Sequence, residues 1–292
     1  MKSLEYYRNS RALKEGISCI LFTKDSEKNI DNLFISLKNS QIDEILISDE
    51  FSKDETVNKL KKYDCKIFFS KENFLERQKE LLKNANYKYV IIVETDQRLT
   101  NNYSNLILDE FKKKEALILQ SLLRVPFPKN YFEKGMALLY EFLKKPGRSY
   151  YFTGPCITYS EFLIDLMNEV KINSNSSIDT IFNEHLQKNK CKMLTSKLIA
   201  HQVENISYQV LKKKFAWYGK GDYYFYKQHQ SQWSFSRKLK SLTHVFRRYF
   251  IILPLYSFLR LKPHLSLFFL LCGFIRYNFF LKELYKKDYL DK

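Results

Sequence analysis

The stretch that most constrains the fold is residues 90–96, which read Val-Ile-Ile-Val-Glu-Thr-Asp. Four β-branched residues in a row are typical of a buried strand in a parallel sheet. The run ends on Glu94 and Asp96, so two carboxylates are expected at the carboxyl edge of the sheet, where open α/β sheets bind ligands. Two carboxylates there can hold a divalent cation, which can neutralise a diphosphate. Alternatively, both acids are solvated strand-end charges or a helix cap, and the heptapeptide alone does not distinguish these interpretations.

The composition restricts the class of protein. The chain has 292 residues, 45% of them hydrophobic, which suits one large α/β domain with an appendage, or two domains. It has seven glycines and neither GxxxxGK[S/T] nor GxGxxG, which argues against a glycine-rich phosphate loop. Five scattered cysteines without a CxxC motif indicate neither a disulfide framework nor a zinc cluster and fit a reducing compartment. Residues 1–15 are polar and lack the apolar segment of a secretory signal, so we expect a cytoplasmic protein.

The positive charge is concentrated near the carboxyl terminus. The net charge is +17, and residues 205–292 hold 17 Lys and Arg against 4 Asp and Glu. This surplus of 13 leaves only about +4 for residues 1–204. Such a bias indicates an anionic partner, either nucleic acid or acidic lipid.

Strand and helix patterns alternate along the first hundred residues. Strands are predicted over 17–22, 42–48, 66–69 and 89–93, with amphipathic helices over 30–37 and 74–84. This alternation implies βαβ crossovers and a mostly parallel sheet. Later helices are predicted over 106–113, 132–144, 161–170 and 178–187, strands over 116–123 and 193–195, an extended segment over 151–159, and a polar loop over 174–177.

Several short motifs occur in the order found in family 2 glycosyltransferases of the GT-A fold, which the chain resembles over about residues 16–225. Asp25-Ser26-Glu27 stands where the family usually has Asn-x-Glu after its first strand. Residues 49–56 are similar to the family's Asp-Asp-x-Ser-x-Asp-x-Thr, with Glu50 replacing the second Asp. The remaining matches are Glu76-Arg77-Gln78 for Ala-Arg-Asn, Glu94-Thr95-Asp96 for Asp-x-Asp, Ile178-Asp179 for Glu-Asp, and His201 for a histidine after the last strand.

The resemblance implies a fold and a donor site. It implies a GT-A, Rossmann-like, mostly parallel sheet flanked by helices, which would bind a nucleotide-diphospho-sugar. Its donor contacts would be Thr23, Glu27, Asp49, Arg77, Glu94 and Asp96. Asp96, assisted by Glu94, would hold Mg²⁺ or Mn²⁺ against the diphosphate, since hard carboxylate oxygens suit these ions. For Asp49 a helix cap remains an alternative, and Arg77 could pair with the diphosphate, with Asp49 or in a surface ion pair.

The resemblance also assigns acceptor-side roles. Asp179 would be the general base, removing the proton of an acceptor hydroxyl as it attacks the anomeric carbon with inversion; the alternative is a helix N-cap. His201 would be a metal or phosphate ligand, although a lone histidine after a strand is often a core residue. The replacements at Glu94 and Ile178 leave open an altered acceptor geometry or an inactive relative.

The carboxyl-terminal third carries basic, aromatic and apolar segments. Residues 211–228 interleave lysines with aromatic rings, and the family often has a basic helix and Tyr-Gly-x-Gly beside the active site here. The apolar runs 249–259 and 265–275 are each too short to cross a bilayer, and basic residues flank them. We expect a helical hairpin in or on the inner leaflet of the cell membrane; packing as ordinary core is the alternative.

The predicted organisation is a polar extension over 1–15, a catalytic domain over 16–204 and a basic, membrane-associated helical region over 205–292. The predicted activity is metal-dependent transfer of a sugar to a lipid-linked or cell-surface glycan, as in polysaccharide biosynthesis of the cell envelope. The alternatives are a nucleic-acid- or membrane-binding protein and an inactive relative. The acids at the strand ends count against nucleic acid, because without a metal they would repel phosphate.

Overall fold

The computed structural model describes residues 2–10, 12–170, 178–203 and 205–288. Its contacts divide the chain into two compact units. The first, here called the sheet unit, comprises residues 1–126, 144–171 and 182–204. The second, called the helical unit, comprises residues 127–143, 172–181 and 205–292. Segment 127–143 and residues 178–181 therefore group with the carboxyl-terminal helices, whereas the predicted boundaries placed them in residues 16–204.

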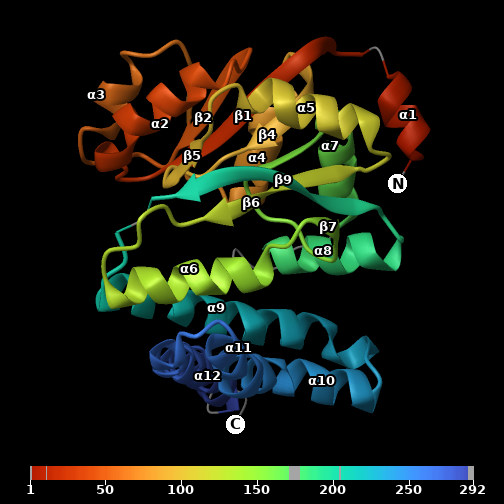
Figure 1. Cartoon of the computed structure of the whole chain (residues 1–292). Helices are drawn as coiled ribbons and strands as arrows, with labels where there is room; N and C mark the ends of the chain where they lie inside the picture. The colour runs from red at the N-terminus through yellow and green to blue at the C-terminus, as the bar shows by residue number, and fades with distance from the viewer. Residues whose placement is uncertain (1, 11, 171–177, 204, 289–292) are drawn as a thin grey trace. The chain divides into compact units, whose positions relative to one another are not determined.

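Nine strands of the described residues form one mixed sheet in the sheet unit, in the order β3-β2-β1-β4-β8-β6-β9-β5, with β7 paired to β9 (Figure 1). The first four in this order, β3 (Lys66–Phe69), β2 (Glu44–Asp49), β1 (Lys14–Thr23) and β4 (Tyr87–Ile92), are mutually parallel. Strands β6 (Ile118–Arg124) and β9 (Met193–Gln202) form a second parallel pair. The remaining strands, β5 (Gln97–Leu99), β7 (Gly147–Ser149) and β8 (Cys156–Tyr159), pair antiparallel with their neighbours.

Helices cover both faces of this sheet. Helices α4 (Phe74–Lys83) and α7 (Ser160–Glu169) contact each other on one face, and α2 (Glu27–Asn39) and α5 (Tyr103–Lys113) lie on the other (Figure 1). The sheet unit also has α1 (Leu4–Asn9), α3 (Thr56–Leu60) and most of α8 (Ile178–Lys188). The buried centre is apolar, because successive residues of β1 and β4 face covering helices on both sides. The predicted GT-A-like α/β fold with a carboxyl-terminal helical extension is confirmed.

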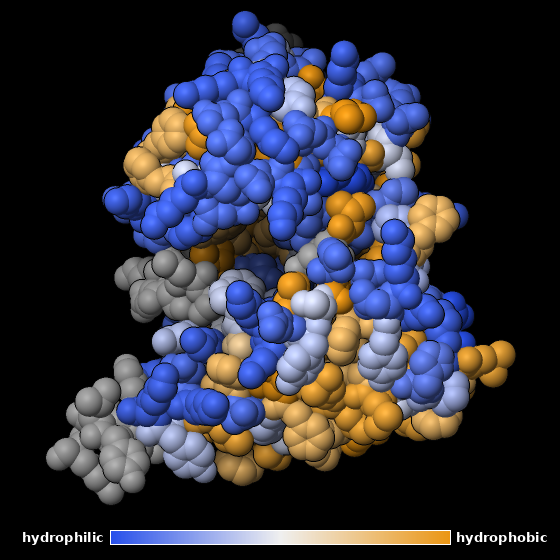
Figure 2. Space-filling view, turned by 90° about the vertical axis from the view of Figure 1, so that its left-hand side faces the viewer, coloured by the Kyte–Doolittle hydropathy of each residue, from blue (hydrophilic) through white to orange (hydrophobic). Residues whose placement is uncertain are grey.

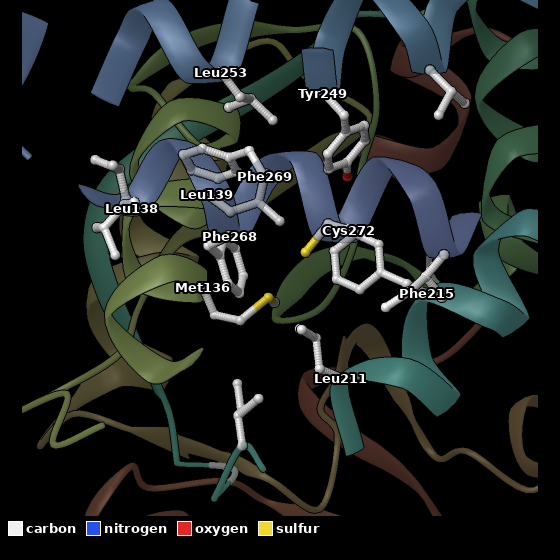
Figure 3. Close-up of a cluster of buried hydrophobic side chains, with 14 residues drawn as sticks. Met136, Leu138, Leu139, Leu211, Phe215, Tyr249, Leu253, Phe268, Phe269 and Cys272 are labelled. Carbon is white, nitrogen blue, oxygen red and sulfur yellow. The ribbon is translucent and has the colours of Figure 1, made fainter. Parts of the chain in front are cut away.

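The helical unit is built around one apolar cluster. Its helices are α6 (Tyr131–Leu143), α9 (Tyr208–His229), α10 (Phe235–Phe246), the π-helical η2 (Arg247–Ile252), α11 (Leu253–Leu259) and α12 (Ser266–Asp288), with short 3₁₀ turns η1 (Gln230–Gln232) and η3 (Pro263–Leu265). Figure 3 shows side chains from α6, α9, η2, α11 and α12 converging on this cluster. Its largest fully buried members are Phe215, Phe268 and Phe269. The apolar runs 249–259 and 265–275 thus each place one helical face in the core of the helical unit.

Two contacts fix α12 against α9. At Gly219 an added Cβ atom would lie 2.2 Å from the backbone oxygen of Arg276, so only glycine permits this approach. Three residues further along α9, Asp222 accepts two hydrogen bonds from the Arg276 guanidinium, at 2.5 Å and 2.7 Å. Burial acts to lower the pKa of Arg276, but the Asp222 carboxylate outweighs it and raises that pKa. The Tyr-Gly-Lys-Gly sequence therefore serves helix packing here.

Replacing Gly219 with alanine should destabilise the protein. Alanine gains about 1 kcal/mol of helix propensity over glycine, but the new Cβ atom meets backbone that cannot rotate away, and overpacking costs about 1–3 kcal/mol. Because the overlap is with backbone, we expect a cost at the upper end of this range and therefore a net loss of roughly 2 kcal/mol in the free energy of unfolding, measured by urea denaturation. The exposed neighbour provides the control: Lys220→Ala should change stability by less than about 0.5 kcal/mol. A Gly219→Ala protein as stable as the wild type would contradict the close packing.

Candidate functional site

The carboxyl ends of β1 and β2 are joined through the buried Asp49. Its carboxylate accepts hydrogen bonds from the Thr23 hydroxyl at 2.6 Å, from the Ser52 hydroxyl at 2.6 Å and from the Ser52 backbone N–H at 2.8 Å. The backbone N–H of Glu50 also donates to the Thr23 carbonyl at 2.9 Å. The structure thus brings the predicted residues Thr23 and Asp49 together, and Asp49 fixes the start of its own loop.

A second set of bonds ties the loop after β1 to the loop after β2. The Asp25 carboxylate accepts from the backbone N–H of Lys53 at 2.7 Å, and the Glu27 carboxylate accepts from that of Glu55 at 3.0 Å. In the opposite direction, the Glu27 backbone N–H donates to Asp54 at 3.1 Å. Because the side chains of each loop satisfy backbone groups of the other, the two loops form one rigid rim.

Asp54 is central to this rim. Besides the N–H of Glu27, it accepts bonds from the Thr56 backbone N–H at 3.0 Å and hydroxyl at 2.5 Å. Partial burial acts to raise the pKa of Asp54, but these bonds outweigh it and lower that pKa. Asp54 therefore braces the loop, and the sequence offers no reason to place it among the reacting groups.

Arg77 on α4 is buried and holds the end of β2. Its guanidinium donates to the Ser48 hydroxyl at 2.9 Å, to the Ser48 carbonyl at 2.7 Å and to the Glu50 carboxylate at 3.0 Å. The ion pair therefore forms with Glu50, which also pairs with Lys24. Of the alternatives considered for Arg77, the pairing with Asp49 is wrong, as is the surface ion pair, since only 5% of Arg77 is exposed.

The residues that follow β4 form a tight turn. The Gln97 backbone N–H donates to the Glu94 carbonyl at 3.0 Å, and the Gln97 side-chain oxygen accepts from the Glu94 backbone N–H at 3.1 Å. The Asp96 carbonyl accepts from the N–H of Val203, just beyond β9, at 2.8 Å. Arg98 also donates to the carbonyls of Thr95 and Gln97. The backbone carrying Glu94 and Asp96 is thereby fixed by bonds within the turn and by one bond from Val203.

The donor atoms at this turn fit a hard divalent cation. Glu94 is exposed and Asp96 is partly exposed, and carboxylate oxygens are the ligands that Mg²⁺ and Mn²⁺ prefer. Among the described residues, no group of three or more His, Cys, Asp or Glu is placed to hold a metal ion. Such an ion would therefore take one or two carboxylates from the protein and further oxygens from a diphosphate, as Mg²⁺ commonly does.

His201 lies in a row of basic residues across the sheet. Its partners in register are Arg98 on β5 and Arg124 on β6. His201 is partly exposed, so it is not a fully buried core residue. The guanidinium groups of both arginines donate to backbone carbonyls, and the positive charge of the row favours an anion over a lone cation. The row therefore suits a phosphate better than a metal ion, unless the phosphate is itself bound to the metal.

One buried cation of the sheet unit, Lys144, has no signal in the sequence. Lys144 is 3% exposed and donates to the Gln120 side-chain oxygen at 2.6 Å. Burial lowers the pKa of Lys144 to about 8, while the nearby Cys156 and Glu94 act in the opposite direction. Lys144 ends the helix predicted over 132–144, and that pattern does not distinguish a buried lysine from a solvated one. Its electrostatic interaction with Glu94 makes it a neighbour of the strand-end turn.

Asp179 belongs to the helical unit and lies in the first turn of α8. The protein around it removes part of its hydration and so raises the pKa of its carboxyl, while the Thr180 N–H and the Arg276 guanidinium act to lower it. By surface area Asp179 is exposed, so this loss of hydration is partial. Its neighbour Ile178, which replaces an expected acid, is buried. A raised pKa suits a carboxylate that must accept a proton.

The sequence matches the family model described as "Glycosyl transferase family 2" over residues 18–165, half of the chain. The chain belongs to this glycosyltransferase family. The match spans the strand-end turn and both bonded loops, so the resemblance carried by those motifs is confirmed. No curated protein matches the sequence.

Solved structures share the fold of this glycosyltransferase at low sequence identity. One is TarS from S. aureus, with 17% identity, a TM-score of 0.52, and coverage of 81% of this chain but 44% of TarS. The chain thus spans less than half of that protein. A TarS fragment, residues 1–349 in complex with UDP-GlcNAc, is 15% identical with a TM-score of 0.51 and coverage of 94% and 92%.

A further similar structure is glucosyl-3-phosphoglycerate synthase from Mycobacterium tuberculosis, in complex with Mn²⁺, UDP and glucosyl-3-phosphoglycerate. It is 12% identical with a TM-score of 0.52, and the match covers 77% of this chain and 84% of that enzyme. At these identities the likeness establishes the fold alone.

Replacing Asp54 with alanine should loosen the loop rim. The change removes three hydrogen-bond acceptor contacts and should lower the free energy of unfolding by roughly 1–3 kcal/mol at neutral pH. Because the folded-state pKa is lowered, the advantage of the wild type is present above the pKa of the unfolded state and is lost as the pH falls through the folded-state pKa. Urea unfolding across pH measures both effects. Asp64→Ala, the same change at an exposed acid, should be nearly neutral, and equal losses in both variants would refute the bracing role.

Proposed function

We propose that this glycosyltransferase transfers a sugar from a nucleotide-diphospho-sugar to a lipid-linked or cell-surface glycan, with Mg²⁺ or Mn²⁺ and with inversion at the anomeric carbon. The observation that carries the proposal is the fixed strand-end turn, which presents Glu94 and Asp96 at the carboxyl edge of the sheet. The rim built from the loops after β1 and β2 supports it, since nucleotides bind at this edge of open α/β sheets.

The donor would be held by groups of the sheet unit. Asp96, with Glu94 assisting, would bind the metal that neutralises the departing diphosphate. The basic row around His201 would bind phosphate oxygens. Thr23, Glu27 and Asp49 would border the nucleoside from the rim, and Arg77 would act by holding Glu50 and the end of β2. UDP is the first nucleotide to test, because one TarS structure contains UDP-GlcNAc and the mycobacterial synthase structure contains UDP.

The acceptor would be activated by Asp179. Removal of the hydroxyl proton by a carboxylate makes the attacking oxygen more nucleophilic, and attack opposite the leaving group inverts the configuration. The raised pKa of Asp179 supports this role, since a stronger base takes up a proton more readily. Acceptor identity would be decided by side chains of residues 125–200.

Replacing Asp96 with asparagine should lower the rate of sugar transfer by at least about 100-fold, because a catalytic metal supplies several kcal/mol of stabilisation. Glu94→Gln should have a smaller effect, since the longer, exposed side chain only assists. The measurement is release of UDP from a panel of UDP-sugars with and without Mn²⁺, preceded by a thermal-shift screen of nucleotides. Asp109→Asn, on α5 of the same unit, is the control.

Unchanged turnover in Asp96→Asn would refute the metal assignment. Failure of the wild type to bind any nucleotide by calorimetry would instead favour an inactive relative. Binding of oligonucleotides with a steep salt dependence would favour a nucleic-acid-binding protein.

The dependence of rate on pH should report Asp179. A general base must be deprotonated, so kcat/KM should fall as the pH drops through the pKa of this carboxyl. Because that pKa is raised, the acid limb should lie above the ordinary aspartate value of about 3.9. Asp179→Asn should lower the rate by about 10²–10⁴-fold and remove this limb from the residual activity. Retention of the limb in Asp179→Asn would exclude Asp179 as the titrating base.

A further inference from the structure

Helices α10, α11 and α12, with η2 between α10 and α11, each bury one face and expose another. The buried faces supply Val245, Leu253, Phe268 and Phe269 to the apolar cluster of the helical unit. The exposed faces are also apolar, which ordinary surface helices are not. Because the inner faces already complete a core, the outer faces need a separate explanation.

The exposed apolar residues follow helical spacing on each element. They are Phe235, Leu239 and Phe246 on α10; Ile251 and Ile252 on η2; Leu255, Phe258 and Leu259 on α11; Leu261 in the following turn; and Leu267 and Phe274 on α12. We call this set the apolar outer face. Figure 2 shows apolar residues gathered on the surface of the helical unit, whereas the sheet unit is covered mainly by hydrophilic residues.

Ring contacts connect the exposed stripes of α10, η2 and α12. Phe246 of α10 stacks on Phe250 of η2 with ring centroids 5.1 Å apart. Phe250 in turn makes an edge contact with Phe274 of α12 at 5.0 Å. Large contiguous apolar patches on soluble proteins mark interaction sites, whereas scattered single residues would not.

The charges around the apolar outer face are nearly all positive. Residues 230–286 contain ten Lys and Arg and a single acid, Glu283. Lys240, Arg247 and Lys262 are exposed beside the apolar residues. Three of the ten are in ion pairs, Arg276 with Asp222, Arg260 with Glu141 and Lys286 with Glu283. A surface that combines apolar side chains with a basic border matches a membrane interface containing anionic lipids.

Helix α12 is packed against the rest of the helical unit. The segment Pro263–Lys286 is long and apolar enough to cross a membrane by length and composition. However, Gly219 and the Asp222–Arg276 pair fix it against α9, and its Phe268, Phe269 and Cys272 are fully buried in the unit's own core. Crossing a bilayer would break these contacts and expose Arg276 to hydrocarbon, which is expensive.

We propose that the apolar outer face of α10–α12 is a membrane-docking surface, which inserts its side chains among lipids in the plane of the interface while its basic border binds anionic headgroups. This extends the peripheral location at the inner face of the cell membrane that the sequence suggested. For residues 249–275 the sequence left two alternatives, a membrane-associated hairpin and packing as ordinary core. The proposal combines them, because the same helices form a core on one side and a lipid-facing surface on the other.

Two other occupants fit the surface less well. A second copy of the chain would bring two basic borders together, and these would repel each other. A nucleic acid could contact the basic residues and stack on the exposed phenylalanine rings, but Leu255, Leu259 and Leu261 offer it neither stacking nor hydrogen bonds, so it would leave the aliphatic part of the face uncovered. An anionic bilayer satisfies the apolar and the basic groups together.

The test is sedimentation of the full chain with vesicles of phosphatidylcholine alone or mixed with about one-third phosphatidylglycerol. We expect clear binding to the mixed vesicles and at least tenfold weaker binding to the neutral ones. The triple change Leu255→Ser, Leu259→Ser and Leu267→Ser should lower the partition coefficient about tenfold or more. Lys240→Gln, Arg247→Gln and Lys262→Gln should remove most of the preference for phosphatidylglycerol.

A matched triple serves as control. Ile35→Ser, Leu106→Ser and Phe127→Ser also remove exposed apolar side chains, but outside the apolar outer face, and should leave vesicle binding unchanged. Circular dichroism and size-exclusion chromatography report folding and oligomeric state. Equal binding by all variants, no vesicle binding by the wild type, or a dimer that only the apolar triple dissociates would overturn the proposal. Because no donor sugar is used, none of these outcomes depends on the proposed transfer reaction.

Discussion

The structure of the sheet unit depends on hydrogen bonds to the backbone groups at the ends of its parallel strands. Strands β1, β2 and β4 stop at one edge of the sheet, and the chain beyond each of them leaves the ladder with unpaired N–H and carbonyl groups. Side chains supply the partners: Asp49 and Asp54 for the loops after β1 and β2, and Gln97 for the turn after β4. This edge is therefore rigid without regular secondary structure, and it is where the family's donor chemistry would take place.

The sequence predicts those parts of this edge that a short run of neighbouring residues identifies. The β-branched run before Glu94 identifies a buried strand, and the acids and hydroxyl residues of 49–56 identify a capped loop. The bonding itself was not predictable, because Thr23 and Asp49 are 26 residues apart and meet only through the parallel register of β1 and β2. Arg77 pairs with Glu50 and not with Asp49. This partner could not be predicted either, because it depends on how α4 packs on β2.

Other features escaped prediction because they are short or depend on tertiary packing. Strands β5 and β7 have three residues each, too few to show an alternating pattern. The helix predicted over 132–144 is α6 in the structure, but only its packing on α11 and α12 groups it with the helical unit. Lys144 lies at the end of the helix predicted over 132–144, and tertiary packing buries it beside Gln120. Ser174–Ser177, predicted as a polar loop, lies outside the described residues.

The bonded rim between the loops after β1 and β2 has a consequence for the thermodynamics of donor binding. Loops that order only when a ligand arrives lose conformational entropy at that moment, at roughly 0.5–1.5 kcal/mol for each immobilised side chain. Here the hydrogen bonds of Asp25, Glu27 and Asp54 to the opposite loop are made by groups of the protein itself. Recognition of the nucleoside at this edge would therefore involve little reorganisation of the protein, so its affinity would be decided by the contacts made and the water displaced.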